Sequence, residues 1–211
     1  MLMQNKFLSR LIKEFEQLNK VPKFQIERAI SPLLGIFIKE IVNKKLNVSV
    51  SVSFPEFPLK HEGDNQSTNI DWLLVDRKNK TLYFIELKTD NLSYNSEQFG
   101  IYKKFKDDIE KDKNAIILEL QLNSIIPKTR RKDKYKSILR KLNEYKVDLS
   151  LYPFLKIVYI APDKPDESMN IVYDDLILLR NLPAKIKTRY IKEWHQLRKF
   201  LKTLSTQYDK K

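Results

Sequence analysis

The chain has 211 residues and a formal net charge of +13, because 40 lysines and arginines stand against 27 aspartates and glutamates. This excess favours a polyanionic partner, either nucleic acid or an anionic membrane surface. Hydrophobic residues make up 42 % of the chain, which predicts a packed core and excludes a disordered basic tail. With no cysteine, two histidines and three glycines, the chain cannot form a disulfide scaffold, a thiolate zinc site, a P-loop or a dinucleotide fingerprint. Any chemistry must therefore use carboxylates, lysines, hydroxyls and amides.

The sequence gives no sign of a membrane segment. Its longest apolar stretch, residues 33–42, is interrupted by Lys39 and Glu40 and is shorter than the ~20 residues that a spanning helix needs. The first residues include several charges and no small-residue cleavage pattern. We therefore expect a cytoplasmic protein without a membrane partner.

Hydrophobic periodicity predicts the elements of the first half. Residues 1–20 are expected to form a helical extension, and residues 24–45 a second, more apolar helix. The spacing then changes to two from Val48 to Phe54, which indicates a strand that ends at the prolines Pro55 and Pro58. Residues 70–75 and 81–87 are two further strands, and the polar turn between them predicts an antiparallel hairpin.

The second half is mostly helical by the same criterion. A helix is expected over residues 99–109 and another over 135–145, within a basic helical insertion at 127–146. Residues 115–126 fit either a helix or a strand, and we favour the helix. Residues 154–160 and 169–173 read as strands, followed by a long amphipathic helix after Pro183 that starts near Ile186. This order predicts a single α/β domain over 1–211, with a mixed central sheet flanked by helices.

Three residues that could carry chemistry fall on the predicted hairpin. Asp71 opens one strand, and Glu86 and Lys88 lie at the end of the other. Glu86 and Lys88 share a face because they are two residues apart, and antiparallel pairing brings Asp71 close to Glu86. The alternative interpretation is a surface salt bridge of Lys88 with one of the carboxylates.

Two converging carboxylates suit Mg²⁺, a hard cation that takes oxygen ligands and keeps several waters. A bound divalent ion lowers the pKa of its water and stabilises the charge that develops during phosphodiester hydrolysis. The neighbouring Lys88 could orient or deprotonate the attacking water, or neutralise the scissile phosphate.

With Asn69-Ile70-Asp71 followed by Glu86-Leu87-Lys88, the chain resembles the PD-(D/E)XK nuclease superfamily, which has the restriction-endonuclease-like fold. Ile70 stands where the often-replaced proline would be. Residues 98–102, Gln-Phe-Gly-Ile-Tyr, are similar to the QxxxY motif of RecB-type members. The likeness covers residues 27–102 and, more loosely, the later strand.

The resemblance implies a nuclease that depends on Mg²⁺ or Mn²⁺. It implies Asp71, Glu86 and Leu87 at the metal and Lys88 as the catalytic lysine. Gln98 and Tyr102 would reach Lys88 or the nucleic-acid backbone. Many members add a glutamate from the helix before the first strand, and Glu27 is the preferred candidate here. The other candidates for that role are Glu40 and, at a strand end, Glu56.

The positive charge is concentrated in two segments, and the first contains candidate nucleic-acid-binding residues: Lys128, Arg130, Arg131 and Lys132. The final helix is also studded with lysines and arginines. Tyr135 and Trp194 could stack on bases, although aromatic residues at helical spacing are more often core residues.

The leading hypothesis is therefore a metal-dependent nuclease acting on nucleic acid, with DNA as the expected substrate. The rival hypothesis is a nucleic-acid-binding or interaction module that has the fold without turnover. The sequence leaves the oligomeric state open, a homodimer included.

Overall fold

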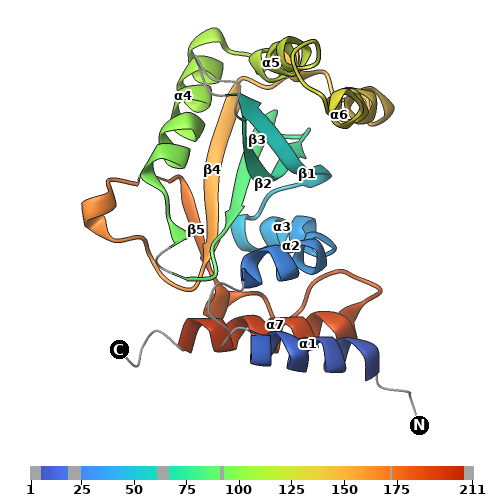
Figure 1. The fold of residues 1–211 in the computed structure, drawn as a ribbon, viewed down its shortest axis with the longest axis vertical. Coiled ribbons are helices and arrows are strands. Elements are labelled where there is room, and N and C mark those ends of the chain that lie inside the picture. The colour runs from blue at the N-terminus through green and yellow to red at the C-terminus, as the bar shows by residue number, and fades with distance from the viewer. Residues whose placement is uncertain (1–5, 19–24, 61–66, 91–92, 172, 207–211) are drawn as a thin grey trace.

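The structure is a computed structural model and describes residues 6–18, 25–60, 67–90, 93–171 and 173–206. Its centre is a five-stranded sheet in the order β1-β2-β3-β4-β5 (Figure 1). The strands are β1 (Val50–Lys60), β2 (Ser67–Asp76), β3 (Thr81–Leu87), β4 (Phe154–Ala161) and β5 (Asp175–Leu178). β1, β2 and β3 pair antiparallel, whereas β3, β4 and β5 are parallel. The expected α/β class with a mixed sheet is confirmed.

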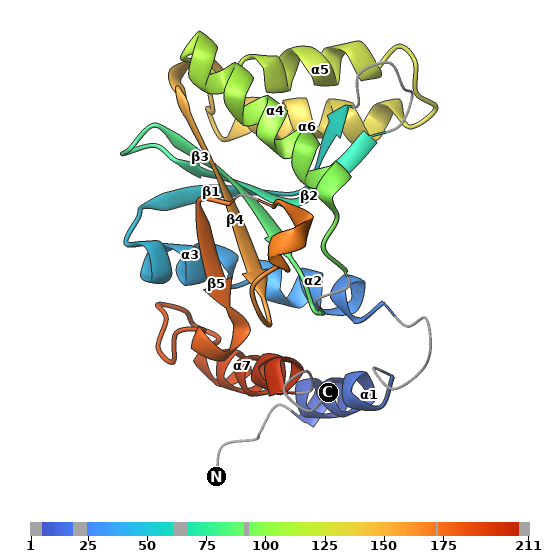
Figure 2. The ribbon, with the colours of Figure 1, turned by 90° about the vertical axis from the view of Figure 1, so that its left-hand side faces the viewer.

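Helices cover both faces of this sheet (Figure 2). One face packs against α4 (Ser96–Asp112), α5 (Ile117–Ile125) and α6 (Lys132–Glu144), and the opposite face against α1 (Lys6–Leu18), α2 (Ile26–Gly35), α3 (Ile38–Leu46) and α7 (Ile191–Thr206). Each face has its own hydrophobic cluster, because successive side chains of a strand point to opposite sides. The central strand β3 is buried along its whole length.

The β2–β3 hairpin forms as predicted. Trp72 pairs with Ile85 and Asp76 with Thr81, so the turn spans the polar residues between them. Asp76 holds this turn, because its carboxylate accepts hydrogen bonds from the main-chain and side-chain amides of Asn79, at 3.1 and 2.7 Å. The turn fixes the register, and the register decides which residues lie opposite one another at the far end.

Two predictions for the first half need correction. The single helix over 24–45 is two helices, with a break at Ile36 and Phe37 between α2 and α3. Residue 24 itself lies outside the described residues. The strand expected to end at the prolines Pro55 and Pro58 continues through both of them to Lys60, and Pro55 pairs with Trp72. Proline is tolerated there because β1 is an edge strand, where its missing N–H need not serve two neighbours.

Two predictions for the second half are also wrong. No strand covers residues 169–173 among those described; Met169 ends a short 3₁₀ turn, and the strand follows at Asp175. Val172 is outside the described residues. The final helix begins at Ile191, so Ile186 and Tyr190 precede it. The helix favoured over residues 115–126 is confirmed as α5.

The two predicted appendages pack against the body of the protein. α1, the described part of the expected extension, lies against α7, and the rings of Phe15 and Phe200 are 6.2 Å apart. α6, inside the expected basic insertion, buries Tyr135, Ile138 and Leu142 in the same cluster as the sheet. Among the described residues, no helix has the length and apolarity needed to cross a membrane.

Candidate active site

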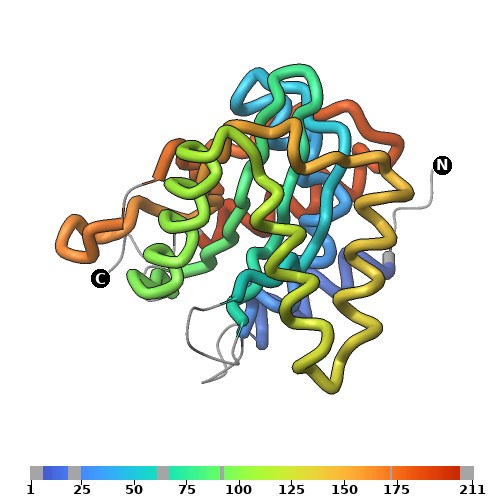
Figure 3. Tube along the Cα trace, turned by 90° about the horizontal axis from the view of Figure 1, so that it is seen from above, coloured from blue at the N-terminus to red at the C-terminus, as the bar shows by residue number. Residues whose placement is uncertain are grey.

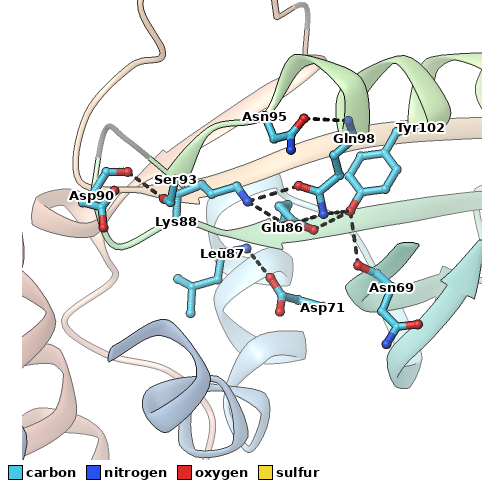
Figure 4. A network of polar contacts seen from close by, with 10 residues as sticks. All are labelled: Asn69, Asp71, Glu86, Leu87, Lys88, Asp90, Ser93, Asn95, Gln98 and Tyr102. Carbon is cyan, nitrogen blue, oxygen red and sulfur yellow. Dashed lines mark hydrogen bonds and ion pairs between the residues drawn. The ribbon is translucent and has the colours of Figure 1, made fainter. Parts of the chain in front are cut away.

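The chemistry-bearing residues of the hairpin gather where β3 ends, β2 begins and α4 starts (Figure 4). Extending the β2–β3 register by one pair beyond Trp72 and Ile85 places Asp71 opposite Glu86. α4 follows β3 after a short connection, and its first turn presents Gln98 to Glu86. The Asn95 side chain caps this helix by accepting a hydrogen bond from the Gln98 amide at 3.0 Å.

Glu86 is buried and is held through both of its carboxylate oxygens. Oε1 accepts hydrogen bonds from Lys88 Nζ at 2.9 Å and from Gln98 Nε2 at 3.0 Å. Oε2 accepts one from the Tyr102 hydroxyl at 2.8 Å. The motif residues therefore form one connected network, as their spacing on the strand and on the helix indicates.

Tyr102 acts within this network and not at the protein surface. Its side chain is fully buried, and its hydroxyl also accepts a hydrogen bond from Gln98 Nε2 at 2.7 Å. The ring packs edge-on against Phe84, with centroids 5.8 Å apart. The expected direct contact of Tyr102 with a nucleic-acid backbone does not fit this burial. Its position instead fits the orientation of Glu86.

Lys88 is a buried cation surrounded by acceptors. Besides Glu86, its ammonium donates to Gln98 Oε1 at 3.3 Å. Burial alone would lower the pKa of Lys88, but the carboxylates of Glu86 and Glu27 outweigh it, and the pKa lies above its ordinary value. Only 4 % of Lys88 is exposed, so the surface salt bridge that the sequence left open is excluded.

Asp71 is tied to the main chain of the motif strand, because its Oδ2 accepts a hydrogen bond from the Leu87 amide at 2.7 Å. The carbonyl of Leu87 faces the same side, since the N–H and C=O of one strand residue point to the same neighbour. Burial raises the pKa of Asp71 to about 9, and the carboxylates of Glu86 and Glu27 add to the rise.

Glu27 reaches this site from the first turn of α2. Burial raises the pKa of Glu27 to about 7, Lys88 opposes the rise, and Glu86 and Asp90 add to it. Such mutual effects require short separations between the charged groups. Glu27 is therefore coupled electrostatically to Glu86 and Lys88, as the sequence-based candidate for this role should be.

Asp90 is a site residue that the sequence reasoning missed. It lies two residues after Lys88, and its Oδ1 is buried without a hydrogen-bond partner among the described residues. A buried carboxylate oxygen without a partner is costly, and a cation is the group that would satisfy it. No strand periodicity marks it, because β3 ends at Leu87 and Asp90 lies in the bend that follows.

The alternative glutamates lie elsewhere. Glu40, on α3, lines a surface cavity together with Lys44, Lys185 and Lys187. Glu56 is exposed on β1 in a left-handed conformation, with φ at 52°. Its Oε2 accepts a hydrogen bond from Asn69 Nδ2 at 3.1 Å, which places it on the rim of the site, two strands from Glu86.

The candidate nucleic-acid residues Lys128, Arg130 and Arg131 lie in the α5–α6 turn, and Lys132 begins α6. All four are exposed. The aromatic residues near the basic segments are core residues: Tyr135 is buried, and the buried Trp194 donates its indole N–H to the Pro183 carbonyl at 3.0 Å. Neither ring is available to stack on a base.

The site is not a ready-made metal cage. In the part of the chain that the structure describes, no three His, Cys, Asp or Glu residues are grouped so as to hold an ion. Mg²⁺, however, usually takes only one or two protein carboxylates and completes its shell with water. Comparison with protein-family models, with curated proteins and with solved structures finds no match.

Proposed function

We propose that this protein is a divalent-metal-dependent nuclease that hydrolyses phosphodiester bonds of DNA, with Mg²⁺ or Mn²⁺ as its cofactor. The observation that carries the proposal is the buried Glu86–Lys88 pair, with Asp71 hydrogen-bonded to the main chain between them and Glu27 close enough to interact with both. The pKa of Asp71 is raised to about 9 and that of Glu27 to about 7. Carboxylates gathered at such a free-energy penalty are typical of functional sites.

The donor set fits a hard cation. Asp71 and Glu86 would supply carboxylate oxygens and Leu87 its carbonyl, and the carboxylate of Glu27 interacts electrostatically with Glu86. The cation would activate water and stabilise the negative charge that develops on the phosphate.

Lys88 and α4 supply the remaining functions. Because its carboxylate neighbours keep Lys88 protonated, its ammonium suits neutralisation of the scissile phosphate better than proton abstraction. The Glu86 carboxylate is held in place by three hydrogen bonds, which are donated by Lys88, Gln98 and Tyr102. Gln98 and Tyr102 are therefore positioning residues.

The test is cleavage of labelled single- and double-stranded DNA and RNA in Mg²⁺, Mn²⁺ or EDTA. Wild type should cleave DNA with either ion and not in EDTA, and Asp71→Asn should abolish cleavage. Asp107→Asn, which neutralises an exposed carboxylate on α4 that is ion-paired with Lys103, is the matched control and should retain activity. Equal cleavage by wild type and Asp71→Asn would sink the proposal.

One observation favours the rival, a binding module without turnover. Both oxygens of Glu86 already have protein partners, so the carboxylate must exchange at least one of them to bind a cation. Metal-independent DNA binding, with no cleavage of any of the four substrates, would establish the rival.

A further inference from the structure

A small cationic cavity lies where the α5–α6 turn meets the ends of β1 and β2. Figure 3 shows this turn from above. The volume of the cavity is about 200 Å³, and it is lined by Lys60, Ser67, Ile125, Lys128, Thr129, Arg130 and Tyr135. It is thus large enough for a single tetrahedral anion with some water.

Three positive charges face the cavity, from Lys60, Lys128 and Arg130. No acidic residue is among its lining residues, and none of the three cations has an ion pair within the described ranges of the chain. Like charges gathered in one cavity repel one another. An anion in the cavity would relieve this repulsion.

The cavity also offers hydroxyl groups. The Tyr135 ring is buried and its hydroxyl shares a hydrogen bond of 3.5 Å with Ser67 Oγ, so one of the two hydroxyls keeps its hydrogen for a ligand. Thr129 Oγ1 accepts a hydrogen bond from the Arg131 amide at 3.1 Å, so its own hydrogen can point elsewhere. Hydroxyl donors combined with a guanidinium are the groups that bind phosphate oxygens.

The ends of two helices border the cavity. Tyr135 is in the first turn of α6, so the positive end of that helix dipole faces this region. At the end of α5, the Ile125 carbonyl accepts hydrogen bonds from the amides of Lys128 and Thr129, at 3.0 and 3.1 Å. That carbonyl is occupied and therefore repels an incoming anion less.

β2 connects this cavity to the active site. Ser67 begins β2, and Asp71 lies further along the same strand. Four residues of strand separate Ser67 from Asp71, a distance of about 14 Å. The Asn69 carbonyl between them accepts a hydrogen bond from the Tyr102 hydroxyl of α4 at 3.4 Å.

We propose that the cavity binds a phosphate group of the same nucleic-acid strand whose scissile bond lies at Asp71, Glu86 and Lys88. This inference rests on the proposed function for the identity of the strand. The phosphate is either a terminal monoester or an internal diester, and both present the same oxygens to Arg130 and the hydroxyls.

The first experiment tests the site without cleavage. Inorganic phosphate is titrated by calorimetry in EDTA into wild type, Arg130→Gln, Tyr135→Phe and a control, Lys141→Gln, in which an exposed α6 lysine that does not line the cavity is neutralised. Arg130→Gln should weaken binding about tenfold or more, because one charge-assisted contact is lost. Tyr135→Phe should weaken it about threefold, and Lys141→Gln should match wild type. Absence of binding in wild type, or equal affinity in Arg130→Gln, overturns the proposal.

The second experiment identifies the source of the phosphate. Anisotropy in EDTA compares one labelled DNA oligonucleotide carrying a 5′-phosphate, a 3′-phosphate or neither. A loss in Arg130→Gln that is confined to one phosphorylated form indicates a terminal group, and an equal loss for all three indicates an internal phosphate. If Arg130→Gln loses affinity in either way but wild type never cleaves DNA, the phosphate site stands and the nuclease proposal fails. If wild type cleaves DNA and Arg130→Gln binds all three oligonucleotides as tightly as wild type, the nuclease proposal stands and the phosphate site fails.

Discussion

Replacement of Glu27 by glutamine should make the metal-free protein more stable at alkaline pH and leave it unchanged at acidic pH. Burial raises the pKa of Glu27 from 4.5 to about 7 in the folded protein. The stability that this group contributes is therefore complete below pH 4.5 and is lost as the pH rises through about 7. Glutamine keeps the shape of the side chain and removes the titration.

The magnitude follows from the size of this change. A rise in pKa from 4.5 to about 7 corresponds to about 3 kcal/mol, and the partial exposure of Glu27 reduces that to about 2 kcal/mol. For a chain of this length, such a difference shifts the melting temperature by about 4–8 °C. The melting temperature of Glu27→Gln should thus lie within about 2 °C of that of wild type at pH 5. At pH 8 it should lie about 4–8 °C above that of wild type.

The assay is thermal unfolding followed by circular dichroism in EDTA at the two pH values, with Glu14→Gln as the control because Glu14 is exposed on α1. Addition of Mg²⁺ at pH 8 should raise the melting temperature of wild type more than that of Glu27→Gln. Parallel pH dependence in wild type and Glu27→Gln would refute the reasoning, as would an equal gain in Glu14→Gln.

Three further predictions follow from the contacts. Lys88→Met should lower the rate of DNA cleavage at least about 100-fold in a time-course assay, because the ammonium stabilises the charge that develops on the phosphate. The affinity for DNA in EDTA should change less than about threefold. A loss of affinity as large as the loss of rate would contradict this role. Tyr102→Phe should lower the free energy of unfolding by about 1–3 kcal/mol in urea titrations, because Glu86 and Gln98 lose a buried hydrogen-bond partner. An unchanged midpoint of urea unfolding would argue against the hydrogen-bond network around Glu86. Gln121→Ala should lower the free energy of unfolding by about 2–3 kcal/mol, because this α5 side chain donates to the Pro58 carbonyl of β1 at 2.8 Å and accepts from the Lys60 amide at 2.6 Å. Hydrogen exchange of the Lys60 amide should become faster in this variant. Unaltered protection of that amide would count against these two hydrogen bonds.

The hairpin and its motif residues could be predicted because local signals determine them. A polar turn between two apolar strands fixes the register, and the register places Asp71 opposite Glu86. The spacing of four between Gln98 and Tyr102 puts both on one side of α4, where both bind Glu86.

The predictions that were wrong concern features that depend on packing between segments distant in the sequence. The hydrophobic spacing runs on through Ile36 and Phe37 and conceals the break between α2 and α3, although Gly35, a residue that often ends helices, stands directly before it. At Gly35 the helix approaches β2 so closely that a Cβ would lie 3.0 Å from the Trp72 indole nitrogen. Asp90 was missed because its oxygen becomes buried only when the chain folds around the site.

The parallel pairing of β3 with β4 has a consequence for folding kinetics. Thr81 pairs with Phe154, so α4, α5 and α6 all lie between two strands that are neighbours in the sheet. Closing such a long crossover is entropically slow, whereas the β2–β3 hairpin and the helices are local. The Lys88 amide donates to the Ile160 carbonyl of β4 at 2.8 Å, so the end of the motif strand gains its last main-chain partner only in that step. Refolding should therefore restore far-ultraviolet helical signal before it restores the geometry of the site, and destabilising substitutions in β4 should slow the later phase selectively.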